Sequence, residues 1–118
     1  MSQATTLILL PETAYNSGNT PGNAYTVTGA YQPAAAYYLG NRDLQTVNLK
    51  LTNVTGNIIL EASLATTPTE QDWFEVGKYV ANSSNTTTYT NIEGNFVYMR
   101  AKVENFSQGT VQYVKLSY

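Results

Sequence analysis

The sequence predicts an all-β protein, an antiparallel β-sandwich of about eight strands with a jelly-roll or immunoglobulin-like order. Three observations predict this fold class. Apolar and polar residues alternate with a period of two along much of the chain, turn-forming residues recur about every 8–12 residues, and no segment shows a convincing helical periodicity. The 118 residues fit a single domain, residues 1–118, which is long enough to bury a core without disulfides.

The first third of the chain contains two predicted strands and one ambiguous segment. Residues 4–10 are apolar or β-branched and end at Pro11, and residues 24–31 form a second, shorter strand. Residues 34–40 fit either a helical turn or a strand. We expect the strand at residues 4–10 to pair within its own sheet, with addition to the sheet edge of a neighbouring molecule as the alternative.

The rest of the chain contains six predicted strands. The clearest is residues 44–53, in which Val47, Leu49 and Leu51 share one face of a half-buried strand. A Gly-Asn turn follows this strand, and a turn at Gly109 separates the last two strands, so each pair is expected to form a hairpin. The five further strands are expected at residues 57–65, 73–80, 86–90, 96–103 and 111–118.

The composition excludes several function classes. The net charge is −2 and the six cations are scattered, which argues against nucleic-acid binding. No stretch approaches the ~20 apolar residues of a membrane span, and the first residues lack the pattern of a signal peptide, so we expect no membrane association and synthesis in the cytoplasm.

Cysteine and histidine are both absent from the chain. Their absence removes thiolate and imidazole metal ligands, cysteine nucleophiles and the usual general base at neutral pH. The remaining candidate is a carboxylate cluster at Glu70, Asp72 and Glu75, which we interpret as a solvated loop that leads into a strand. We therefore expect a protein that is not an enzyme and that uses no cofactor or metal.

The core and one polar face can be assigned from the alternation. Arg100 and Lys102 share a strand face with Tyr98, and Glu61 or Lys50 is expected across from them as an ordinary ion pair. Trp73 is expected to plug the core. The predicted core residues are Trp73, Val97, Met99, Val103 and Leu116.

A set of eight tyrosines suits three roles: a subunit interface, cross-strand packing, or a platform on which sugars stack. The set is Tyr25, Tyr31, Tyr37, Tyr38, Tyr79, Tyr89, Tyr98 and Tyr113. Tyrosine offers a large apolar ring with a polar tip, which is typical of protein interfaces. The candidate interface residues are Leu7, Leu9, Tyr25, Tyr31, Tyr37 and Tyr38.

Two motifs in the second half carry a resemblance to a known family. They are Asp72-Trp73-Phe74 and the segment "GNFVYMRAKV" at residues 94–103, followed by a Gly turn and a last alternating strand. In this order they resemble small β-sandwich virion structural proteins of tailed bacteriophages. The resemblance covers residues 56–118, about half of the chain, and does not extend to the first 50 residues.

This resemblance implies a structural role in a virion assembled in host cytoplasm. The expected role is capsid decoration or cementing, in which the protein binds the major capsid protein or another virion protein and bridges neighbouring shell subunits. A neck or tail accessory part is also compatible. The resemblance further implies a homo-oligomer, for example a trimer. The alternative from another class is a carbohydrate-binding module for host attachment that uses exposed tyrosine faces.

Overall fold

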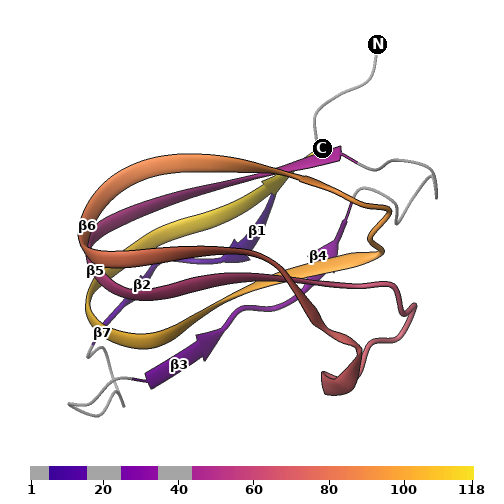
Figure 1. Cartoon of the computed structure of the whole chain (residues 1–118), viewed down its shortest axis with the longest axis horizontal. Helices are drawn as coiled ribbons and strands as arrows, with labels where there is room; N and C mark the ends of the chain where they lie inside the picture. The colour runs from indigo at the N-terminus through magenta and orange to yellow at the C-terminus, as the bar shows by residue number, and fades with distance from the viewer. Residues whose placement is uncertain (1–5, 16–24, 35–43) are drawn as a thin grey trace.

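The computed structural model describes residues 6–15, 25–34 and 44–118. They form one antiparallel sheet of seven strands in the order β1–β7–β5–β6, with β2, β3 and β4 also paired to β7 (Figure 1). A single 3-10 turn, η1 (Glu70–Asp72), lies between two of the strands. The strands are β1 (Thr6–Leu10), β2 (Thr13–Ala14), β3 (Tyr25–Thr28), β4 (Gln32–Pro33), β5 (Leu44–Ser63), β6 (Phe74–Glu93) and β7 (Tyr98–Ser117).

The predicted all-β, antiparallel class is confirmed, but the finer assignment is not. Hydrogen bonds join all seven strands into one open sheet, so neither a jelly-roll nor an immunoglobulin-like sandwich is established. The strand at residues 4–10 contributes β1, which pairs with β7 of its own chain from Thr6 to Leu10.

The three long strands each bend near the middle, and Figure 1 shows them curving together on one side of the molecule. Each bend contains a non-glycine residue with positive φ: Asn53 (54°), Ser83 (50°) and Asn105 (55°). The bends lie beside each other, because Ser83 N donates to Thr55 Oγ1 at 3.0 Å and Gln108 Nε2 donates to Ser83 Oγ at 2.9 Å. The whole sheet therefore bends as a unit.

The bends correct the two predicted hairpins, which were wrong. Residues 44–52 do not pair with residues 57–63; both segments belong to β5 and both pair with β7 on one side and β6 on the other. The two ends of β7 likewise do not pair with each other, because both pair with β5. A single residue with a left-handed backbone conformation bends a strand and changes its direction. The favoured two-residue hairpin turns, by contrast, reverse the chain fully.

The bend divides the sheet into two limbs. The first limb contains β1, β2 and residues 44–52, 86–93 and 110–117; the second contains β3, β4 and residues 57–63, 74–81 and 98–104. Residues 94–97 connect the end of β6 in the first limb to the start of β7 in the second. A link this short spans at most about 18 Å over its five Cα steps, so the limb ends lie close together.

The inner faces of both limbs contribute to one core. Val47 and Leu49 come from the first limb and Ile58 and Leu60 from the second, and all four are buried. A Cβ atom on Gly77 of the second limb would lie 3.8 Å from Ile92 of the first limb, which shows that the inner faces are in contact. The period-two pattern therefore identified the inward face of each limb.

The predicted core residues divide into two groups. Met99, Val103 and Leu116 are fully buried in the core. Trp73 and Val97 are only partly buried and are not core members. Trp73 leaves the core because the η1 turn directs it to the outer face of the second limb, where it contacts Arg100.

The predicted interface residues also differ in their exposure. Leu9 was assigned to the interface, but it is fully buried on the inner side of β1, so this assignment is corrected. Leu7 is partly buried, and Tyr31 is 46% exposed. The side chain of Tyr25, together with Tyr37 and Tyr38, lies outside the described residues.

Candidate functional site

A nearly buried arginine organises the outer face of the second limb. Arg100 on β7 lies directly opposite Glu61 on β5, and its Nε donates to Glu61 Oε1 at 2.8 Å. Only 8% of Arg100 and 9% of Glu61 are exposed. The sequence pattern placed Glu61 across from Arg100 as one of two options, but it predicted a weak surface pair rather than this buried one.

The turn at η1 covers this arginine. Arg100 Nη1 donates to Glu70 Oε2 at 2.9 Å and Nη2 to Glu70 Oε1 at 3.3 Å, so the guanidinium binds the carboxylate with two nitrogens. The carboxylate of Asp72 holds the turn itself, because it accepts hydrogen bonds from Thr69 N at 2.7 Å and from the Thr69 hydroxyl at 3.0 Å.

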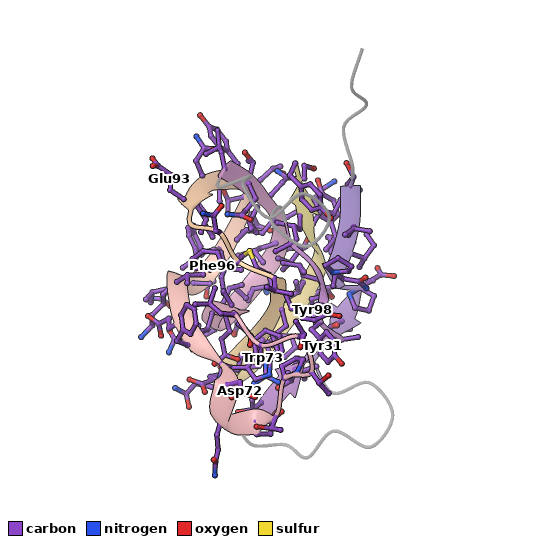
Figure 2. All side chains as sticks on the ribbon, turned by 90° about the vertical axis from the view of Figure 1, so that its right-hand side faces the viewer. Tyr31, Asp72, Trp73, Glu93, Phe96 and Tyr98 are labelled. Carbon is purple, nitrogen blue, oxygen red and sulfur yellow. The ribbon has the colours of Figure 1, made fainter. Side chains whose placement is uncertain are left out.

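Three aromatic rings complete the cluster. The guanidinium carbon of Arg100 lies 4.5 Å from the ring centroid of Trp73. Tyr31 packs against Trp73 with centroids 5.6 Å apart and against Tyr98 with centroids 4.9 Å apart. Figure 2 shows the three rings close together beside the turn that carries Asp72. We call Tyr31, Trp73, Tyr98 and Arg100 the aromatic cluster.

The charges around Arg100 shift the pKa values of two neighbours. The hydrogen bond from Arg100 and its positive charge lower the pKa of Glu70 below the usual 4.5. Burial lowers the pKa of Lys102, but the hydrogen bond to Glu104 and the charge of Glu61 outweigh it, so the pKa lies above its usual value. Lys102 Nζ lies 3.4 Å from Glu61 Oε2 and 3.2 Å from Glu104 Oε2. Both pKa shifts favour the charged form of the side chain.

The three carboxylates of the predicted cluster have different neighbours. Glu70 is committed to Arg100 and Asp72 to Thr69, while Glu75 lies on β6 opposite Glu61. Within the described ranges, no group of three acidic side chains is arranged to hold a metal ion. The arrangement fixes the η1 turn on the sheet and holds the three aromatic rings together beside it.

A pocket of about 220 Å³ opens on the other side of the second limb, where the edge strand β6 leaves the core partly uncovered. Its walls come from both limbs and include Leu49, Leu60, Gly77, Tyr79 and Thr88. No sequence pattern indicated this pocket, because the pocket depends on how the two limbs of β6 face each other across the bend.

Comparison with known protein families and with curated proteins found no match for this chain. Across the described segments, no helix is long and apolar enough to cross a membrane.

Proposed function

We propose that this protein is a non-enzymatic virion structural protein of a tailed bacteriophage, which decorates and cements the capsid by bridging major capsid subunits. In this proposal the bent sheet serves as a β-sandwich, because two inner faces share one core. The protein is assembled into the virion from host cytoplasm and acts in many copies, which gain avidity on a symmetric lattice even when each contact is weak.

One observation carries the proposal. The two motifs that resemble phage virion proteins come together in space, since Trp73 of the first motif lies over Arg100 of the second. The contact makes the two motifs a single physical unit rather than two separate matches in sequence. It supports the resemblance on which the virion role rests.

The aromatic cluster is the surface that we propose for the contact with the shell. Tyrosine, tryptophan and arginine are the residues most often responsible for binding energy at protein interfaces. Tyr31 is 46% exposed, and its ring is held by Trp73 and Tyr98, so little conformational entropy is lost when a partner covers it.

A carbohydrate-binding role is the second candidate, favoured by the same exposed Tyr31 ring. An exposed aromatic ring offers a flat apolar surface on which a sugar can stack. A neck or tail accessory part would use the cluster as a protein contact, as a cement protein would.

Co-sedimentation of the purified protein with undecorated tailed-phage capsids tests the proposal. We expect saturable binding at a copy number set by the capsid lattice. Binding that does not saturate, or no binding, contradicts the cement role. In that case, binding in a glycan screen would support the carbohydrate role, and binding to isolated necks or tails would support an accessory part.

A further inference from the structure

The edge strand β6 carries a pattern that is complementary to itself. Among the described residues β6 pairs only with β5, so its other edge is open to a further strand. Three of the large apolar side chains that are strongly exposed lie on this strand: Phe74, Val80 and Tyr89. An exposed edge with apolar side chains is a site at which another strand adds.

The faces of the second-limb part of β6 are fixed by its pairing with β5. Phe74 and Tyr79 lie opposite Ala62 and Ile58, which are core residues, so both are on the inner face. Glu75 and Lys78 lie opposite Glu61 and Ile59 and are both on the outer face, although they are three residues apart. A bulge at Val76 produces this spacing, because Leu60 pairs with Gly77 while the next residue, Glu61, pairs with Glu75.

We propose that two copies of this chain associate through antiparallel pairing of β6 with β6, about a two-fold axis between Val76 and Gly77. In this register Glu75 of each copy faces Lys78 of its partner, and the ion pair therefore forms twice. The same register places Phe74 opposite the partner's Tyr79 on the inner face. Both of these pairs join residues from matching faces of the two sheets, as a continuous sheet requires.

The charges explain why this edge selects its own copy. A lysine on an edge strand normally deters pairing with other strands. Here Lys78 is matched by Glu75 in one antiparallel register, so the two charges favour that register and oppose shifted ones. A two-fold contact closes on itself and gives a dimer, which replaces the trimer that the resemblance implies. This inference does not depend on the proposed virion role.

Sedimentation equilibrium of the full chain over a range of concentrations tests the proposal. We expect the wild-type protein to reach twice the 12.9 kDa mass of the chain. Lys78→Glu and Glu75→Lys each place like charges across the axis twice, and each should weaken the dimer roughly tenfold or more. Lys50→Glu makes the same charge change as Lys78→Glu, but at an exposed position on β5, and should leave the dimer unchanged.

A mixture of the two single variants gives the sharpest readout. The Glu75→Lys chain carries two positive charges at the contact and the Lys78→Glu chain two negative charges, so the mixture should form a heterodimer at concentrations at which each variant alone is mostly monomeric. This recovery also shows that both variants are folded. A wild-type monomer or trimer, a dimer unaffected by Lys78→Glu, or a mixture that stays monomeric would overturn the proposal.

Discussion

The outer faces of the two limbs differ in how far they are covered and in the polar contacts that they carry. On the second limb the face is covered by the η1 turn and carries nearly buried charges, with Arg100 between Glu61 and Glu70. On the first limb the face is open and mostly uncharged, and its strands are joined by neutral contacts such as Thr46 Oγ1 to Asn91 Oδ1 at 2.7 Å. We call these the covered face and the open face.

The difference between the two faces follows from the access of water to their side chains. A charge on the covered face is shielded from water and must be paired. Removing one partner of an ion pair there leaves the other charge buried without compensation. On the open face water remains available, and short threonine and asparagine side chains need only local partners. The covered face should therefore be sensitive to single substitutions, while the open face should tolerate them.

Removing Arg100 should produce the largest effect. Arg100→Ala leaves Glu61 nearly buried with only Lys102 nearby, and we expect a loss of about 3–5 kcal/mol in the free energy of unfolding, measured by denaturant titration. The exposed Lys50 of the open face is the control, and Lys50→Ala should change stability by less than about 0.5 kcal/mol.

A paired substitution tests the reason for that loss. If the unpaired Glu61 carboxylate is responsible, Arg100→Met combined with Glu61→Leu should be more stable than Arg100→Ala, because no buried charge remains without its partner. A double variant that is less stable than Arg100→Ala would contradict this explanation.

The bend separates the two limbs, and a substitution of Gly109 tests how strongly the fold depends on this bend. Gly109 has φ 89°, and a Cβ atom there would collide with the carbonyl oxygen of Asn53 in the adjacent bend. Gly109→Ala should cost about 2 kcal/mol, since both the backbone conformation and the space oppose the methyl group. Thermal unfolding measures this loss. Ser107→Ala, at an exposed position in the same bend, should cost much less in the same measurement.

The contact between the η1 turn and the sheet should weaken in acid, because the Glu70 carboxylate makes it with Arg100. Because the pKa of Glu70 is lowered in the folded protein, its contribution to stability is present above the usual pKa of 4.5 and is lost as the pH falls through the folded pKa. The wild type should be more stable than Glu70→Gln at pH 7, and the difference should vanish in strong acid.

Trp73, the single tryptophan of the chain, reports the same event by fluorescence. Its emission should change as Glu70 is protonated in the wild type and should be insensitive to this pH range in Glu70→Gln. Glu93→Gln, an exposed carboxylate at the end of β6, should behave as the wild type. An identical pH response in Glu70→Gln would contradict the role of Glu70.

The smallest effect is expected on the open face. Lys115 Nζ lies 4.2 Å from the ring centroid of Tyr113, and such a contact contributes about 0.5–1 kcal/mol at an exposed site. Lys115→Ala should therefore cost far less than Arg100→Ala in the same titration. Equal losses would remove the distinction between the two faces.

The sequence predicted the parts of this structure that depend on local pattern. Alternation identified the inward residues of both limbs, including Val47 and Ile58, and placed Arg100 and Lys102 on one polar face. It could not predict the bends, because asparagine and glycine with positive φ occur in bends and in hairpin turns alike. The choice between them depends on pairings such as Thr46 with Ser117, which are remote in the sequence.

The candidate site was only partly predictable for the same reason. Trp73 was expected to plug the core, where a solvated loop leads into a strand. Its contact with Arg100 depends on the η1 turn, which is held by Glu70 across a separation of 30 residues. No local pattern indicates that contact.

In the proposed virion role, the covered face contacts the partner. The most direct measurement is capsid co-sedimentation of two single variants, Tyr31→Ala on the covered face and Tyr89→Ala, a 67% exposed ring on the open face, each first shown to be folded by circular dichroism. We predict that Tyr31→Ala weakens binding roughly tenfold, as for an interface anchor, and that Tyr89→Ala binds as the wild type does. Normal binding by Tyr31→Ala together with loss of binding by Tyr89→Ala would contradict the claim and place the contact on the open face.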